Sequence, residues 1–150
     1  MSTHWQQLAA MWRDAGLKIR PSVNSAAIRD FEIKHDVVLP ADLRDYFLTV
    51  DGMEDDLDPG MNRFWPLAMV KLVNEELKDI HPDRWAYPDC YIFADHCLWC
   101  LAWAIRLGKK QLEISEPVFQ VTGAEVPGRM IAPSFSDFVQ MYLGNPDSVL

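Results

Sequence analysis

The sequence lacks the features that mark membrane-spanning and secreted proteins. No apolar run approaches the ~20 residues that a membrane-spanning helix needs. Residues 1–5 contain neither the basic start nor the apolar stretch of a signal peptide. We therefore expect a cytoplasmic protein. The length of 150 residues suits one domain over residues 1–150, with a core that needs no disulfide or metal.

Basic residues are also scarce. The chain has 14 Lys and Arg against 22 Asp and Glu, which gives a formal net charge of −8. A protein that neutralises phosphate groups needs the opposite sign, so we expect no nucleic-acid partner and, without a spanning segment, no membrane partner. A protein with a basic surface would suit this charge, because complementary fields steer the encounter of two proteins.

Only three cysteines are present, Cys90, Cys97 and Cys100. An odd number makes a poor disulfide framework, whereas reduced buried thiols are common in cytosolic proteins. A zinc site with His96 is the alternative, but structural zinc needs four converging ligands. If Cys97 and Cys100 lie on one strand, their spacing of three sends them to opposite faces. We expect buried structural thiols and no metal.

Catalytic motifs are missing as well. The sequence has no G-x-S-x-G elbow, no phosphate-binding loop and no H-E-x-x-H metal-binding helix. The segment 123–128 has glycines at both ends but is followed directly by no helix, so it predicts a turn and no dinucleotide site. We therefore expect no enzymatic activity and no cofactor.

Helical periodicity dominates the first third of the chain. Thr3 and Gln6 can form a capping box, and apolar residues then recur at helical spacing. Glycine after a periodic segment favours a helix end, and proline favours a first helical turn. The patterns predict helices from Thr3 to Gly16, from Pro21–Ser22 to His35, and from Pro40 to Asp51–Gly52.

The patterns after the third expected helix predict mainly strands. Helices first, hairpin-linked strands next and a helix last predict an α+β fold. In it a largely antiparallel sheet packs against the N-terminal helices and one C-terminal helix. We expect strands over 63–67, 90–94, 97–107 and 116–121, a turn at Asp95–His96, a short helix over 67–77, an exposed loop over 78–89 and a last helix from Ser134 to Gly144.

Five carboxylates gather after the third expected helix, with no basic residue among them. A solvated loop, an acidic patch that faces a partner, and a calcium site are the three interpretations. The calcium site lacks the D-x-[DN]-x-[DN]-G order of a known calcium loop. The candidate partner-binding residues are Asp51, Glu54, Asp55, Asp56 and Asp58.

Two aromatic residues, Trp85 and Tyr87, fall in the expected loop over 78–89. Aromatic side chains in an irregular loop either fold back onto the core or serve as interface anchors. Both interpretations stay open, and we add the two residues to the partner-binding candidates.

Several short motifs follow one another in a fixed order. They are Ile28-x-x-Phe31-Glu32, Leu39-Pro40, Asp51-Gly52, Phe64-Trp65-Pro66-Leu67, Tyr91-Ile92-Phe93-Ala94-Asp95 and Ser134-Phe135-x-x-Phe138. In this order they resemble the SUKH superfamily, whose fungal members include a regulator of cell-wall synthesis. The resemblance spans residues 22–144. Asp51 stands where Asn is commoner in the family, which the helix-end geometry tolerates.

The resemblance implies function by binding. Bacterial members of the family resemble immunity proteins, which bind a cognate toxin in the cytoplasm and neutralise it. Fungal members resemble regulatory scaffolds, and the family has no shared catalytic residues to carry over. We therefore expect either an immunity protein for a polymorphic toxin, or a regulatory or scaffolding protein-interaction module with no toxin partner.

Overall fold

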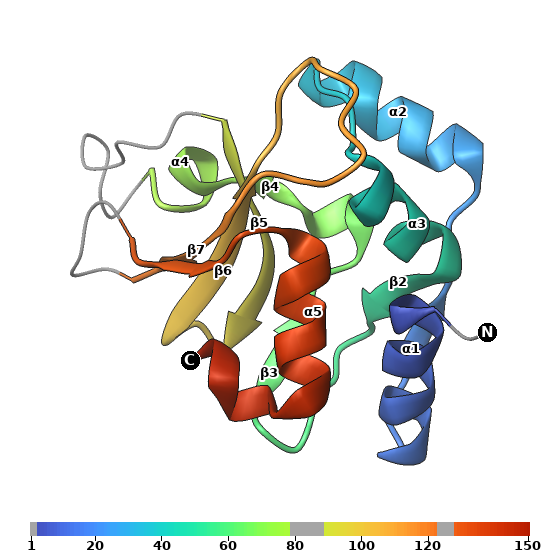
Figure 1. Cartoon of the computed structure of the whole chain (residues 1–150), viewed down its shortest axis with the longest axis vertical. Helices are drawn as coiled ribbons and strands as arrows, with labels where there is room; N and C mark the ends of the chain where they lie inside the picture. The colour runs from blue at the N-terminus through green and yellow to red at the C-terminus, as the bar shows by residue number, and fades with distance from the viewer. Residues whose placement is uncertain (1–2, 79–88, 123–127) are drawn as a thin grey trace.

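The computed structural model describes residues 3–78, 89–122 and 128–150 (Figure 1). The helical elements are α1 (His4–Asp14), α2 (Ser25–His35), α3 (Ala41–Thr49), η1 (Leu67–Met69), α4 (Val73–Glu76), α5 (Phe135–Gly144) and η2 (Pro146–Val149), where η marks a 3₁₀ helix. The strands are β1 (Ile19–Pro21), β2 (Val50–Met53), β3 (Asn62–Phe64), β4 (Lys71–Leu72), β5 (Cys90–His96), β6 (Leu101–Arg106), β7 (Val118–Val121) and β8 (Met130–Ala132).

The larger sheet is antiparallel throughout. Its strands lie in the order β3-β5-β6-β7-β8, and β4 pairs with another stretch of β5. β1 and β2 form a separate antiparallel pair. α5 lies over one face of the larger sheet and also contacts α1 and α3 (Figure 1). The predicted α+β fold, with N-terminal helices and a closing C-terminal helix, is confirmed.

The capping residues of α1 and α5 are those that the sequence predicts. The Thr3 hydroxyl accepts a hydrogen bond from the Gln6 N–H at 3.2 Å, and the Gln6 side chain accepts one from the Thr3 N–H at 3.0 Å. Ser134 accepts a hydrogen bond from the Asp137 N–H at 3.0 Å at the start of α5. These local contacts satisfy N–H groups that have no partner within their own helix.

The start of α2 differs from the prediction. The helix begins at Ser25, because the Asn24 side chain accepts a hydrogen bond from the Ala27 N–H at 2.9 Å. Pro21, predicted to open the helix, is the last residue of β1. Asparagine is among the strongest N-caps, so it determines the boundary.

The predicted helix end at Asp51–Gly52 is also wrong. α3 stops at Thr49, and residues 50–53 form the buried strand β2. Gly52 has φ of +68°, a left-handed value, but it lies within the strand. A Cβ at Gly52 would come within 2.6 Å of the Phe64 carbonyl oxygen. Glycine is required here because two backbone segments pack against each other.

The predicted helix over 67–77 is divided into η1, β4 and α4. Val70 has an extended backbone with ψ of 125°, which ends η1. Lys71 and Leu72 then pair with Ile92 and Tyr91 of β5. The open side of β5 offers backbone hydrogen-bond partners, and this tertiary pairing outweighs the helical pattern.

The hairpin of β5 and β6 turns later than predicted. β5 continues through Asp95 and His96, where we predicted a turn, and the turn comprises residues 97–100. Cys97 is half-buried and Cys100 is exposed, while Cys90 is buried as expected. The prediction that Cys97 and Cys100 are buried on opposite faces of a strand is therefore wrong, because both lie in a turn.

The other strands differ less from their predicted limits. β3 covers residues 62–64 in place of 63–67, and β7 covers 118–121 in place of 116–121. β8 was not predicted, because its three residues show no alternation that distinguishes them from a loop. No helix in the described part of the chain is long and apolar enough to cross a membrane.

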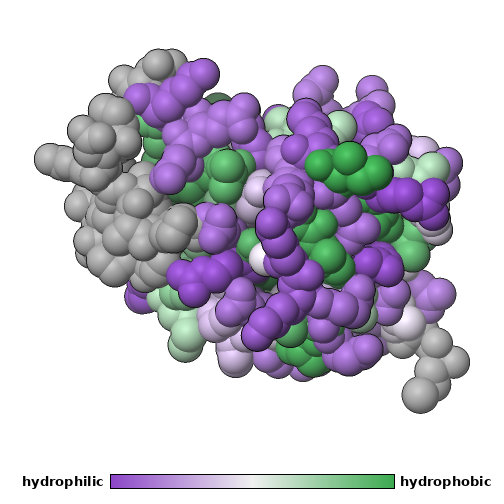
Figure 2. Space-filling model, turned by 90° about the horizontal axis from the view of Figure 1, so that it is seen from above, coloured by the Kyte–Doolittle hydropathy of each residue, from purple (hydrophilic) through white to green (hydrophobic). Residues whose placement is uncertain are grey.

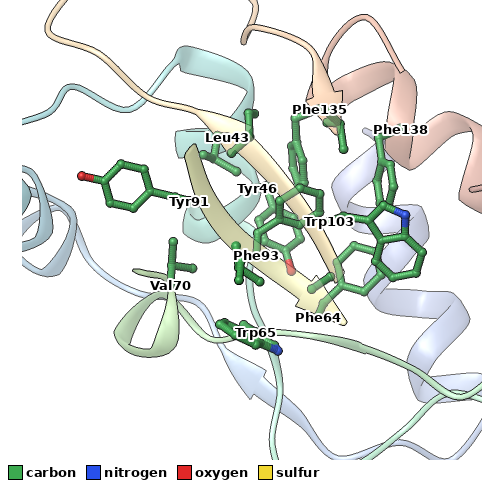
Figure 3. Packing of buried hydrophobic residues seen from close by; sticks show 14 of the residues in the cluster. Leu43, Tyr46, Phe64, Trp65, Val70, Tyr91, Phe93, Trp103, Phe135 and Phe138 are labelled. Atoms are coloured by element: carbon green, nitrogen blue, oxygen red, sulfur yellow. The ribbon is translucent and has the colours of Figure 1, made fainter. Parts of the chain in front are cut away.

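The core is rich in aromatic rings that connect α5 to the sheet (Figure 3). Phe93 of β5 meets Phe135 and Phe138 of α5, with both ring centroid distances at 5.2 Å. Trp103 of β6 packs against Phe138 at 5.5 Å. Its indole N–H donates to the Val149 carbonyl oxygen at 2.8 Å, which ties η2 to the sheet.

Candidate functional site

Asp51, the first of the five acidic candidates, is a buried residue of β2 with 4 % of its surface exposed. One carboxylate oxygen accepts a hydrogen bond from the Leu67 N–H at 2.7 Å, and the other accepts one from Arg20 Nε at 3.3 Å. Burial raises the pKa of Asp51, and the contacts with Leu67 and Arg20 oppose that rise. Asp51 therefore fixes the start of η1 against β2.

Asp58 is also buried, with 3 % of its surface exposed. It accepts hydrogen bonds from the Asn62 N–H at 2.7 Å, from Asn62 Nδ2 at 3.1 Å and from the hydroxyl group of Tyr142. Trp12 Nε1 donates to the same hydroxyl group at 3.1 Å. Burial, together with the hydrogen bond to Asp58, raises the pKa of Tyr142. Internal donors therefore occupy the Asp58 carboxylate.

The three remaining acidic candidates lie at the surface, and we call Glu54, Asp55 and Asp56 the acidic edge. Glu54 and Asp55 are exposed, and Asp56 is half-buried. Asp56 accepts a hydrogen bond from the Lys18 N–H at 3.2 Å, while Asp55, fully exposed, lies 3.4 Å from Arg63 Nη2. The structure thus divides the predicted acidic group into two internal residues and an accessible edge.

The two aromatic candidates, Trp85 and Tyr87, lie outside the residues that the structure describes. They stay predictions from the sequence.

A depression lies next to the acidic edge. Three hollows, of about 450, 400 and 240 Å³, adjoin one another around the exposed residue Ala68 of η1. We call the three together the η1 depression. The smallest reaches Glu54 and Asp55, and the other two border the C-terminal end of α2. The acidic edge and the η1 depression therefore form one continuous stretch of surface.

Two side chains in the wall of the depression present hydrogen-bond donors without acceptors. Arg63 Nε and Trp99 Nε1 are buried and have no hydrogen-bond partner among the described residues. Arg63 Nη2 contacts only weak or exposed groups, the Met69 sulfur at 3.3 Å and Asp55 at 3.4 Å. A buried donor without a partner costs about 1–3 kcal/mol. Both atoms are enclosed in the structure, so an acceptor on a ligand reaches them only if the Arg63 and Trp99 side chains shift.

The depression carries charges of both signs. Lys71 pairs with Glu76 at 2.6 Å, and Asp95 accepts a hydrogen bond from Trp65 Nε1 at 2.6 Å. Arg20, Lys34 and Arg63 also line the hollows. With Lys71, four of the chain's 14 basic residues therefore gather in the depression beside the acidic edge, on a protein of net charge −8. This surface can bind a partner through polar and charged groups of either sign.

His35 lies at the junction of two of the hollows. Its ring packs against Phe31 at 4.4 Å and against Tyr91 at 5.4 Å. Burial and the neighbouring charge of Lys34 lower the pKa of His35, and Glu75 acts in the opposite direction. His35 is therefore a packed residue of the depression whose protonation is disfavoured by folding.

Two larger hollows, of about 640 and 610 Å³, lie elsewhere on the surface, one lined by Asp45 and Glu113 and the other by Lys109 and Lys110. On the face shown in Figure 2 the residues are mostly hydrophilic, and hydrophobic ones form separate patches. Strongly exposed apolar residues such as Ile33, Leu98 and Ile114 come from different segments of the chain. This pattern favours recognition by polar contacts over docking on one large apolar area.

The described residues contain no group of three or more His, Cys, Asp or Glu side chains that could hold a metal ion. Burial raises the pKa of Cys90 to about 11, so this thiol stays protonated at neutral pH and is a poor nucleophile. The acidic edge and the η1 depression present hydrogen-bond donors, acceptors and charged groups, which are suited to binding a partner.

Sequence reasoning missed the η1 depression. Arg20, Lys34, Arg63 and Trp99 belong to four segments, and each looks ordinary in its own stretch of sequence. The local signal that could have pointed to it was Trp65-Pro66, a tryptophan directly before a proline that stops the strand. The acidic edge was found because its members are consecutive.

The chain was compared with curated proteins and with models of protein families. No curated protein matches the chain. The family model described as SMI1 / KNR4 family (SUKH-1) matches residues 22–141, which include the acidic edge and the residues of the η1 depression except Arg20. A match over more than half of the 150 residues shows the family. The chain belongs to the SMI1 / KNR4 family (SUKH-1).

Proposed function

We propose that this protein is a non-catalytic immunity protein, which binds a cognate polymorphic toxin in the cytoplasm and neutralises it. One observation carries the choice of surface. The accessible acidic edge borders a depression whose wall contains two buried donors, Arg63 Nε and Trp99 Nε1, without acceptors among the described residues. Membership in the SUKH-1 family supports a binding role.

The acidic edge would face a basic surface of the toxin. The ion pair of Asp55 with Arg63 is exposed on the Asp55 side, and exposed pairs contribute little to stability. Asp55 is therefore able to exchange its partner for a cation on the toxin, which leaves the Arg63 guanidinium to bind an acceptor. Charges at the rim of an interface act mainly on the rate of association. Asp51 and Asp58 would hold this surface in place from below, and Trp85 and Tyr87 stay candidate contacts.

The test is binding to a cognate toxin domain, which is first sought among the genes that neighbour this one. The variant E54Q/D55N/D56N should still fold and should associate about tenfold more slowly at low salt, with a flatter salt dependence. A matched control, D45N/E113Q/D147N, removes the same charge from exposed residues elsewhere. Association is measured by stopped flow or surface plasmon resonance over a range of salt concentrations.

Equal association rates of the two triple variants would contradict the role of the acidic edge. Growth of cells that express the toxin tests neutralisation directly, because an immunity protein must restore it. Failure to bind or protect, together with co-purification of a protein unrelated to any toxin, would favour the regulatory scaffold.

A further inference from the structure

The four-residue turn between β5 and β6 begins and ends with a cysteine. Its sequence is Cys97-Leu98-Trp99-Cys100. The Cys97 carbonyl oxygen accepts hydrogen bonds from the Cys100 N–H at 3.3 Å and from the Cys100 thiol at 3.0 Å. A four-residue turn brings its end Cα atoms within about 7 Å, and a disulfide bridges Cα atoms about 4.4–6.8 Å apart. The hydrogen-bonded turn therefore brings the two cysteines close to the separation that a disulfide spans.

The two thiols also interact with each other. The pKa of the Cys100 thiol is raised, and its largest cause is a hydrogen bond with the Cys97 side chain. The Cys100 sulfur therefore lies against Cys97 in the folded protein, where it donates to the Cys97 carbonyl oxygen.

The backbone of this turn has an uncommon conformation. Cys97, Leu98 and Trp99 have φ of +53°, +54° and +75°, values that residues other than glycine rarely adopt. Backbone in such regions is unfavourable for residues with a Cβ and persists where surrounding contacts hold it. Here the Cys97 N–H donates to the Met61 carbonyl oxygen at 2.8 Å, which fixes the turn to the neighbouring segment. The turn thus holds the two thiols close together in the resting protein.

Exposure separates this pair from the third cysteine. Cys100 is exposed and Cys97 is half-buried, whereas Cys90 is 1 % exposed within β5. A dissolved oxidant can reach Cys100 first and leaves Cys90 untouched. The chain therefore provides its own unreactive control thiol.

We propose that Cys97 and Cys100 form a redox modification site, in which a low-molecular-weight disulfide of the glutathione class converts the two thiols into an intramolecular disulfide. Exposure makes Cys100 the attacking thiol, although its raised pKa lowers the fraction of thiolate. Cys100 loses its proton and attacks one sulfur of the oxidant, which forms a mixed disulfide and releases one thiolate. Cys97 loses its proton and attacks the Cys100 sulfur, which forms the intramolecular disulfide and releases the second thiolate. The two released thiolates take up the two protons, so one oxidant is reduced to two thiols.

The experiment uses the full chain treated with oxidised glutathione, followed by alkylation of remaining thiols in denaturant and mass spectrometry. We expect a species lighter by two hydrogen atoms with one alkylated cysteine, Cys90. No Lys or Arg lies between residues 85 and 106, so trypsin leaves all three cysteines in one peptide. The variant C90S therefore serves to leave one possible pair, and it should oxidise at the parent rate.

Two further variants complete the test. C97S should stop at a mixed disulfide of Cys100 with glutathione, and C100S should show at least tenfold slower modification. Phenylarsine oxide, which binds closely spaced dithiols, should bind the parent and C90S in a 1:1 ratio and should not bind C97S or C100S. Circular dichroism verifies that each variant is folded. A stable mixed disulfide on the parent chain, or a disulfide that includes Cys90, would overturn the proposal.

Discussion

The hydroxyl group of Tyr142 donates a hydrogen bond to the buried carboxylate of Asp58. This contact connects α5, near the C-terminus, to the segment that carries the acidic edge. Trp12 of α1 donates to the same hydroxyl group at 3.1 Å, so three parts of the chain meet at one oxygen atom. The segment that carries the acidic edge is therefore held in place by buried hydrogen bonds of Asp58 to the core.

Replacing Tyr142 by Phe should destabilise the protein by about 1–3 kcal/mol, because the Trp12 N–H loses its acceptor and Asp58 loses a donor. Tyr46→Phe is the matched control. The Tyr46 hydroxyl is buried beside the Gly52 N–H, without a hydrogen bond of good geometry among the described residues. Its removal should change the free energy of unfolding, measured in urea, by less than about 1 kcal/mol. Equal losses in the two variants would contradict the network.

Phe47 is 1 % exposed on the inner face of α3, and its neighbour Leu48 is 37 % exposed. Phe47→Ala should cost about 3–5 kcal/mol, the usual range for removing a large side chain from a close-packed core. Leu48→Ala should cost less than about 1 kcal/mol, because little buried surface is lost. Chemical denaturation of both variants measures the difference. A loss below 1 kcal/mol for Phe47→Ala would mean that this face of α3 is not the packed one.

Gly52→Ala should be strongly destabilising. The positive φ alone costs about 1–3 kcal/mol in a residue with a Cβ, and the contact of 2.6 Å with the Phe64 carbonyl oxygen adds to this cost. Gly144→Ala is the control, because a Cβ at that end of α5 meets no atom within 4 Å. The control should be neutral or stabilise the protein by up to about 1 kcal/mol. Similar thermal unfolding temperatures for the two variants would exclude the close backbone approach at β2.

His35 should make stability depend on pH. Its pKa in the folded protein is below the ordinary value of 6.5, so the unfolded chain binds more protons between the two values. The contribution of His35 to stability is then complete above pH 6.5 and is lost as the pH falls toward the folded pKa. His35→Gln should flatten the stability curve in this interval.

Two charge variants test the cause of this shift. Lys34→Gln should raise the pKa of His35, and Glu75→Gln should lower it further, because these neighbours act in opposite directions. NMR titration of the His35 ring measures both. A shift in the same direction for the two variants would contradict the assignment of the charges around the ring.

The parts of the fold that the sequence predicted correctly depend on local chemistry. The caps Thr3 and Ser134 act within three residues of themselves, so the starts of α1 and α5 could be read directly. The wrong predictions concern elements whose structure depends on contacts with segments that are distant in the sequence. Residues 67–77 lose their helix to pairing with β5, and the turn of the β5–β6 hairpin is fixed by Met61, far from it in sequence.

The candidate site also has parts that the sequence predicted and parts that depend on tertiary contacts. Consecutive carboxylates were visible in the sequence, but the burial of Asp51 and Asp58 depends on Leu67, Asn62 and Tyr142. Apart from Trp65-Pro66, the η1 depression had no sequence signal of its own, because its basic and aromatic walls come from separate segments. A spacing of three between two cysteines means opposite faces on a strand and close neighbours in a turn.

The Tyr142 hydroxyl, which contacts both Trp12 and Asp58, also affects how far the chain can be truncated. Residues 22–141 match the family, yet Trp12 precedes this range and Tyr142 follows it. A fragment trimmed to the matched range would leave Asp58 without the Tyr142 hydroxyl, Phe64 without the Trp12 ring and the Trp103 indole without the Val149 carbonyl. We therefore expect the cooperative folding unit to be larger than the family signature, and a stable fragment to need both flanking segments.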